Sequence, residues 1–368
     1  MLTATPTIRV MVVDDSAVVR GLVSRQLASD RGIEVVCTAS NGEIALREMT
    51  RHEVDIVVLD IEMPVMDGLT ALTHILAAHP RVKVIMASTL TRRNAEISLR
   101  ALQLGASDYV AKPETGLAGA AEFQRELVAK IKALGTRRPP RTGPPPAQPV
   151  RGAAPAPPSL AASWPRPPIP PLGRKPRPQV IAIGASTGGP PALVTLFEAL
   201  RGAITQPILL TQHMPATFTA LLAEQLARAG ERPCAEAKDG EAVEGGRCYV
   251  APGGWHMTVG RSGATPVIRL NQEPPENFCR PAVDPMMRSA ARVYGPGVLA
   301  VILTGMGADG AKGCEAVAAA GGRFIVQDEA TSVVWGMPGA AAATGLADTI
   351  LPISEIGPWV RRNSEVAA

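Results

Sequence analysis

Short apolar runs alternate with amphipathic segments through the first 134 residues. The apolar runs predict strands at 7–15, 33–40, 55–60, 82–88 and 108–113. The segments between and after them have helical spacing and predict helices at 16–29, 41–52, 68–79, 94–105 and 121–134, with Ser16 as an N-cap. Because the strands are continuously apolar rather than alternating, both faces of their sheet must be covered. The pattern therefore predicts a doubly wound α/β domain with a five-stranded parallel sheet.

The same alternation resumes after residue 178. Apolar strands are predicted at 179–186, 207–213, 298–305 and 324–329, most of them ending in small or polar residues. Two further strands, within 246–259 and 265–270, are joined by turns and suggest an antiparallel excursion. This half is therefore predicted to be a second doubly wound α/β domain, with a mostly parallel sheet of about seven strands.

A proline-rich segment separates the two halves. Residues 136–178 contain eight Arg and Lys side chains and no acidic residue, whereas the whole chain has a net charge of +4. The remainder is therefore acidic, at about −4, which argues against a nucleic-acid-binding domain. Proline-rich sequence favours an extended tether, and its charge fits a solvated linker better than a surface for nucleic acid or anionic lipid. The predicted domains are 1–134 and 179–368, with a linker at 135–178.

Other features point to a cytoplasmic protein. The five cysteines are scattered without metal-ligand spacing and are expected to be reduced thiols. The first residues lack the pattern of a signal peptide, and no apolar run is long enough to cross a bilayer.

Chemically matched side chains follow the strands of the first domain. Asp14 and Asp15 end the first strand, Asp60 the third, Ser88 the fourth and Lys112 the fifth. Carboxyl ends of parallel strands meet at one edge of the sheet, where ligands bind. Clustered carboxylates repel one another unless a cation such as Mg²⁺ bridges them. The set predicts that Lys112 and Ser88 contact a phosphoryl group on Asp60; the alternative is a row of ordinary polar strand ends.

Three motifs carry a family resemblance: the DD pair at 14–15, LDIEMPVMDG around Asp60 and KP at 112–113. With them, residues 8–134 resemble a response-regulator receiver domain, which has a flavodoxin-like fold. The resemblance implies Mg²⁺ held by the acids and the backbone carbonyl of Glu62. It also implies phosphorylation of Asp60 by a histidine kinase. Tyr109 falls at the aromatic switch position of such domains, whereas the residues alone favour a half-buried strand aromatic.

The second domain opens with a strand that runs into GASTGGP. Gly184 to Gly188 fits G-x-S-x-G, which holds a nucleophilic serine, here Ser186, on a tight turn before a helix. The P-loop and G-x-G-x-x-G patterns are not matched. The alternative is a glycine turn whose serine caps the following helix.

A nucleophilic serine needs a base and an acid that orients the base. His213 ends a strand at the same sheet edge as Ser186, whereas His256 is more simply a half-exposed strand histidine. Asp309 follows another strand, and Asp284 is the second choice for the acid. The order Ser-His-Asp differs from that of α/β-hydrolases.

The turn GMGADG at 305–310 offers backbone donors for an oxyanion. Among them, the amide of Met306 is the natural candidate.

Six motifs give nearly all of residues 179–353 a resemblance to the chemotaxis protein-glutamate methylesterases, the CheB family. In chain order they are GASTGGP, QHMP, YVAPGGWHM, RPAVDPMM, LTGMGADG and SVVWGMPGAA. The resemblance implies a triad of Ser186, His213 and Asp309, with the Thr187 hydroxyl on the histidine and the Met306 backbone at the oxyanion. It implies hydrolysis of glutamate methyl esters on chemoreceptors without a cofactor for the esterase step, and in some members deamidation of glutamines. The unphosphorylated receiver is expected to cover the catalytic edge, and the enzyme to act at receptor arrays without entering the membrane. One departure is Ala282, where the family often has serine.

Two other functions fit parts of the chain. A receiver could gate a non-enzymatic binding module, but such a module does not need serine, histidine and aspartate together at strand ends. A transcriptional regulator would need a basic helix-turn-helix domain, and no such pattern is present.

Overall fold

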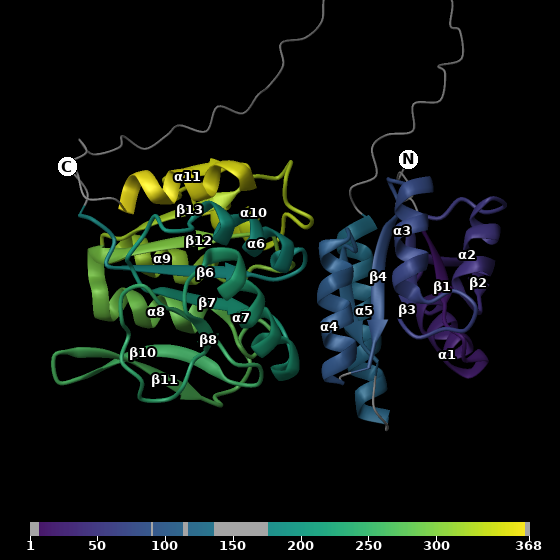
Figure 1. Cartoon of the computed structure of the whole chain (residues 1–368), viewed down its shortest axis with the longest axis horizontal. Helices are drawn as coiled ribbons and strands as arrows, with labels where there is room; N and C mark the ends of the chain where they lie inside the picture. Colours follow the sequence, from purple (N-terminus) through teal and green to yellow (C-terminus); the bar gives the residue numbers. More distant parts are fainter. Residues whose placement is uncertain (1–6, 90, 113–116, 136–175, 365–368) are drawn as a thin grey trace, which may run out of the picture.

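The computed structural model describes residues 7–89, 91–112, 117–135 and 176–364. They form two α/β units (Figure 1). The segment 136–175, which makes up most of the predicted linker between them, lies outside the described residues.

The first unit is a five-stranded parallel sheet with the order β2-β1-β3-β4-β5. Its helices α1 and α5 cover one face, and α2, α3 and α4 cover the other. This confirms the doubly wound receiver fold. The elements are β1 (Ile8–Val13), α1 (Ala17–Ala28), β2 (Ile33–Ala39), α2 (Gly42–Met49), β3 (Ile56–Asp60), α3 (Gly68–Ala78), β4 (Lys83–Ser88), α4 (Arg92–Gln103), β5 (Asp108–Ala111) and α5 (Leu117–Gly135).

Local sequence explains where several of these helices begin. The side chains of Ser16, Asn41, Asp67 and Thr91 each accept a hydrogen bond from the backbone N–H three residues later. Such caps satisfy N–H groups that have no partner within the helix. The expected N-cap at Ser16 is confirmed.

The second unit contains a seven-stranded parallel sheet with the order β14-β13-β12-β6-β7-β9-β8 and a separate antiparallel hairpin, β10-β11. The parallel sheet and the antiparallel excursion were both predicted. Its elements are β6 (Val180–Ala185), α6 (Gly189–Ala199), β7 (Ile208–Gln212), α7 (Ala216–Gly230), β8 (Cys234–Glu236), β9 (Cys248–Val250), β10 (His256–Ser262), β11 (Thr265–Asn271), α8 (Val283–Tyr294), β12 (Val298–Ile302), α9 (Ala311–Ala319), β13 (Arg323–Gln327), α10 (Met337–Ala343), β14 (Thr349–Leu351) and α11 (Ile353–Ser364).

Both faces of this sheet are buried. Helices α6, α7 and α11 pack on one face, and α8, α9 and α10 on the other. The central strands β12, β6 and β7 consist of fully buried residues, which is why their sequences are continuously apolar.

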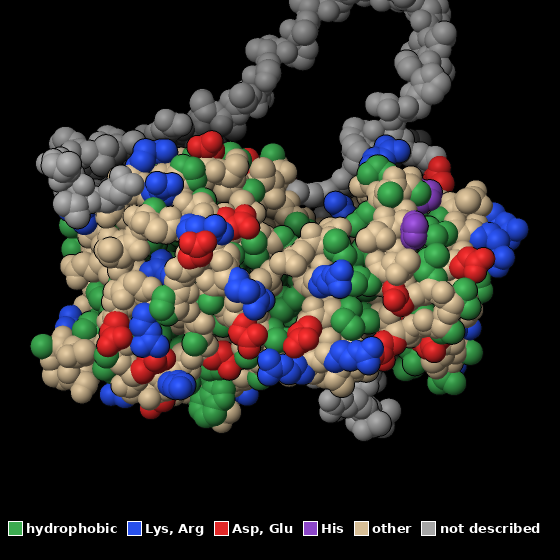
Figure 2. Space-filling model, in the orientation of Figure 1, with side chains coloured by type: hydrophobic (Ala, Val, Ile, Leu, Met, Phe, Trp, Pro, Cys, Tyr) green, Lys and Arg blue, Asp and Glu red, His purple; other side chains and the backbone are tan. Residues whose placement is uncertain are grey.

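The two units pack against each other through the β5 edge of the first. Helix α4 lies against α6 and α7, and one apolar cluster runs from α4 and Tyr109 into α6 and α7 (Figure 1). Acidic and basic side chains are interspersed over the visible face of both units (Figure 2). Nowhere in the described ranges is there a helix long and apolar enough to cross a membrane.

Candidate functional site

Ser186 lies on a tight turn between β6 and α6. Its N–H donates to the Thr304 carbonyl (3.0 Å), and its carbonyl accepts from Gly189 N–H (2.7 Å) and the Gln212 side chain (3.0 Å). Gly188 has φ +76° and ends the turn as the N-cap of α6 without any side-chain cap. A Cβ at Gly188 would lie 2.5 Å from Val333, so both conformation and space require glycine. Capping by the Ser186 side chain, the alternative interpretation, is therefore wrong.

His213 and Asp309 form a buried pair beside this turn. His213 follows β7, and its Nε2 lies 2.7 Å from Oδ2 of Asp309, whose side chain is only 1% exposed. The same carboxylate accepts from the N–H groups of Val283 (2.6 Å) and Asp284 (3.0 Å) at the start of α8. Burial alone would raise the pKa of Asp309, but His213 and these N–H groups lower it below its usual value. Asp309 is therefore an anionic partner for His213.

Asp284, the second choice for the acid, has another role. Its Oδ1 accepts from the N–H groups of Gly310 (3.0 Å) and Gly313 (2.6 Å) at the start of α9. Burial and the neighbouring Asp309 raise the pKa of Asp284. It caps a helix and does not bond to His213.

The second nitrogen of His213 faces a cysteine. Nδ1 lies 3.4 Å from Sγ of Cys279, and in the described part of the chain the Ser186 hydroxyl has no hydrogen bond to His213. Burial opposes protonation, but Asp309 and Cys279 together raise the pKa of His213 to about 10. In this arrangement the imidazole is cationic at neutral pH and is not joined to the serine.

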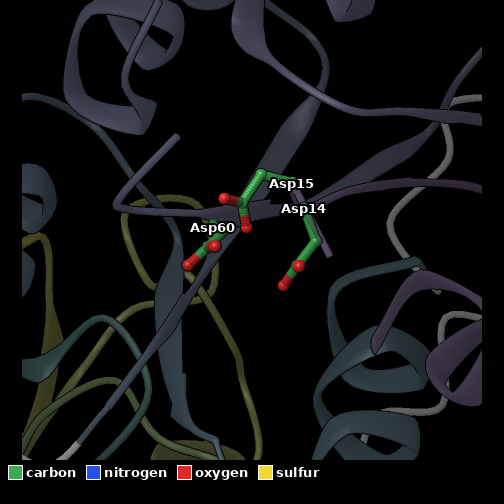
Figure 3. A group of neighbouring side chains, drawn as sticks. All are labelled: Asp14, Asp15 and Asp60. Atoms are coloured by element: carbon green, nitrogen blue, oxygen red, sulfur yellow. The ribbon is translucent and has the colours of Figure 1, made fainter. Parts of the chain in front are cut away.

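The other acidic cluster lies at the carboxyl edge of the first sheet. Asp14, Asp15 and Asp60 offer carboxylate oxygens that all lie within 4.8 Å of one another (Figure 3). Lys112 bonds Asp14 (2.6 Å) and Asp60 (2.7 Å). Burial raises the pKa of Asp60 despite the lysine; the pKa of Lys112 is lowered by burial but raised overall by its two carboxylates. Three acids around one lysine carry excess negative charge, which suits a divalent cation.

The remaining receiver residues surround this cluster. Ser88 is buried and donates to the carbonyls of Thr89 (3.1 Å) and Asn94 (3.4 Å). Glu62 and Asp15 line a cavity of about 710 Å³ beside the cluster, together with Arg93 on α4. The cavity leaves room for a reactant next to the acids.

Tyr109 is buried between the two units. Its ring stacks on Phe218 of α7, with centroids 4.3 Å apart and planes 7° from parallel. Burial, with Asp108 nearby, raises the pKa of Tyr109 well above its usual value, so the phenol stays protonated. The expectation of a half-buried side chain is wrong because Phe218 covers the ring.

Comparison with known proteins matches each of the two units to a protein family. Residues 181–360 match the family model "CheB methylesterase", and residues 10–118 match "Response regulator receiver domain". A "Protein-glutamate methylesterase/protein-glutamine glutaminase 1" from Paramagnetospirillum magneticum is 56% identical over 98% of this chain and 97% of its own length. Proteins of the same activity name from Rhodospirillum centenum (56% identical over 96% of this chain and 93% of its own) and Azospirillum brasilense (53%, over 98% and 94%) are similarly close. The chain belongs to the CheB family.

One residue implied by the CheB resemblance has a different partner here. Thr187 was expected to bond the histidine, but its hydroxyl donates to Oδ2 of Asp108 in the receiver, at 2.6 Å. The reason is that β5 of the receiver lies directly over the turn, so that Thr187 is only 3% exposed. The expectation is wrong for this covered arrangement.

Met306 also lies under the receiver. Its side chain packs with Val333 and Val334 against the apolar cluster of α1 and α5. Its N–H donates to no acceptor among the described residues, so it is available for an oxyanion.

The expectation of a half-exposed His256 is wrong. It is 1% exposed; its Nδ1 accepts from Ala282 N–H (3.2 Å), and Nε2 lies 3.2 Å from the Pro274 carbonyl. Ala282, the departure from the CheB pattern, is the N-cap of α8 and makes no side-chain cap there.

Two residues of the site were not found from the sequence. Asn277 donates to Oδ1 of Asp309 (2.9 Å) and to Asp284 (3.1 Å), and Cys279 contacts His213. Their only signal was a position just ahead of the RPAVDPMM motif.

Proposed function

We propose that this CheB-family protein is a phosphorylation-activated serine esterase that hydrolyses glutamate methyl esters on chemoreceptors and releases methanol. The observation that carries the proposal is the 2.7 Å contact between His213 and Asp309 beside the Ser186 turn. The receiver docked on Thr187 supports regulation of this site.

The proposed acylation step uses Nδ1 of His213, because Nε2 is held by Asp309. In the open enzyme, after His213 has lost the proton that it holds in the covered form, Oγ of Ser186 attacks the ester carbonyl carbon while its proton passes to Nδ1. The carbonyl oxygen becomes an oxyanion stabilised by the Met306 N–H. When the intermediate collapses, the bond to the methoxy oxygen breaks, and that oxygen leaves as methanol with the proton from His213.

The second step hydrolyses the acyl-enzyme. A water molecule gives a proton to His213 and attacks the same carbonyl, and Ser186 departs with the proton that His213 returns. The product is a glutamate carboxylate. The same route with an amide substrate would release ammonia, which would make this protein a glutamine deamidase as well, as the names of its relatives state for those proteins.

The receiver would control access to this site. An oxygen of Asp60 would attack the phosphorus of a histidine kinase's phosphohistidine, and the bond to the imidazole would break, with its electron pair leaving on the imidazole nitrogen. Asp14, Asp15, Asp60 and the Glu62 backbone would hold Mg²⁺, which would offset the charge of the phosphoryl group. Lys112 and Ser88 would contact its oxygens. Release of the β5 edge would then uncover Thr187 and Met306 and shift the population toward an open form.

The proposed setting is the cytoplasmic side of receptor arrays. The five cysteines carry free thiols, which supports a reducing compartment. The partners are chemoreceptors as substrate and a histidine kinase as phosphodonor.

The test is methanol release from receptor membranes carrying tritiated methyl esters. Ser186→Ala should lower the rate by at least about a thousandfold, because removal of a nucleophile leaves only binding and oxyanion effects. A rate close to that of the wild type would refute the assignment of Ser186.

A further inference from the structure

A tight turn at Glu276–Cys279 projects an aromatic ring beside the site. Cys279 N–H donates to the Glu276 carbonyl (2.9 Å), and the two central residues, Asn277 and Phe278, have φ values of +51° and +64°. A bulky side chain rarely adopts positive φ, and Phe278 is 100% exposed. Neither backbone preference nor burial accounts for phenylalanine at this position. A strained residue that persists next to a functional site is an indication of function.

The turn is held firmly on both sides of the ring. Asn277 bonds Asp309 and Asp284, and Cys279 contacts His213, so each neighbour of Phe278 touches the proposed catalytic pair. At the base of the turn, Glu276 accepts two hydrogen bonds from Arg288 (2.9 and 2.5 Å). These contacts place the Phe278 backbone at a defined position one residue away from a contact with His213.

A second exposed aromatic lies in the neighbouring loop. Trp255 is 40% exposed and follows Gly254, whose N–H donates to the Arg280 carbonyl (3.1 Å). The receiver buries Thr187 and Val334 but leaves both rings exposed. The rings are therefore accessible whether or not the receiver is docked.

We infer that Phe278 is a substrate-contacting residue that binds an apolar side chain of the receptor segment next to the methyl ester. The inference rests on the esterase site proposed above. Aromatic side chains lose little conformational entropy on binding and form strong contacts at protein interfaces. A fully exposed ring held on a rigid turn suits a protein substrate, whose side chains flank the reacting group.

Phe278→Gly is the sharpest test, because glycine removes the ring and accepts the positive φ without strain. With tritium-methylated receptor membranes, acetyl phosphate and Mg²⁺, KM should rise about tenfold while kcat stays within about twofold. Phe278→Leu should recover part of the loss, since it restores an apolar side chain. Leu346→Ala, which trims a 51%-exposed leucine elsewhere on the unit, should leave both constants unchanged.

An unchanged KM in Phe278→Gly would overturn the inference. A fall in kcat alone would also overturn it, because that result would mean that the turn only positions the catalytic pair. Ser186→Ala in the same assay separates the two proposals. If that variant keeps releasing methanol, the esterase proposal fails; if it is inactive and Phe278→Gly has an unchanged KM, only the present inference fails.

Discussion

The hydroxyl of Thr187 donates a 2.6 Å hydrogen bond to the carboxylate of Asp108, which connects the receiver to the residue that follows Ser186. Both residues are buried. A hydrogen bond to a charged acceptor is stronger than one between neutral groups, and burial protects it from water. The receiver therefore does more than occlude the site sterically, because it takes the Thr187 hydroxyl as a donor.

The strand that carries the Asp108 contact leads directly to Lys112, which pairs with Asp60, the proposed phosphorylation site. Asp108 and Tyr109 begin β5, and Lys112, just beyond its end, bonds Asp60. A change in the contacts of Lys112 on phosphorylation would act on the same short segment that holds Thr187 and Phe218. This gives a physical route from Asp60 to the esterase turn.

Asp108→Asn should raise the activity of the unphosphorylated full-length protein. The substitution removes the charge from the acceptor of the Thr187 hydrogen bond, which costs about 1.4 kcal/mol, or about tenfold in the balance between covered and open forms. Basal methanol release should rise by up to about tenfold, and the phosphorylated rate should stay unchanged. Initial rates with and without acetyl phosphate check both expectations.

Glu126→Gln is the matched control for Asp108→Asn. Glu126 and Asp108 both pair with Lys130. Unlike Asp108, Glu126 forms no hydrogen bond or ion pair with the catalytic unit among the described residues. Its basal rate should equal that of the wild type. Equal basal rates for Asp108→Asn and the wild type would show that the hydrogen bond does not hold the covered form.

Protonation of His213 should stabilise the resting protein in a pH-dependent way. Its pKa is raised to about 10, compared with about 6.5 in an unfolded chain. Stability linked to the bound proton is thus fully present below about pH 6.5 and is lost as the pH rises toward 10. The difference in thermal midpoint between the wild type and His213→Gln should shrink over this range. A constant difference from pH 6.5 to about 9.5 would contradict the raised pKa.

The sequence predicted those features that follow from strand periodicity and strand ends. Asp60, Lys112, Ser186, His213 and Asp309 were all placed at the carboxyl ends of parallel strands, because that position depends only on where each apolar run stops. His213 contacts Asp309 and not Asp284, in line with the preferred prediction. The N–H groups at the start of α8 that hold the Asp309 carboxylate could not be located from periodicity.

The remaining features depend on contacts between distant segments. The partner of Thr187 is set by docking of the two units, because Asp108 and Thr187 are 79 residues apart in the sequence. The burial of Tyr109 by Phe218 has the same origin. The role of Asn277 depends on a turn in which Asn277 and Phe278 both have positive φ, and the sequence Asn-Phe does not predict such a turn. Neither local propensity nor hydrophobic pattern specifies such contacts.

The most direct test of phosphorylation-activated esterase activity is the initial rate of methanol release by the full-length protein, with and without acetyl phosphate and Mg²⁺. Stimulation should be severalfold in the wild type and absent in Asp60→Asn, which should keep the low basal rate because its catalytic unit is unaltered. Asp60→Asn that responds to acetyl phosphate as the wild type does, or a wild type that releases no methanol under either condition, would contradict the account.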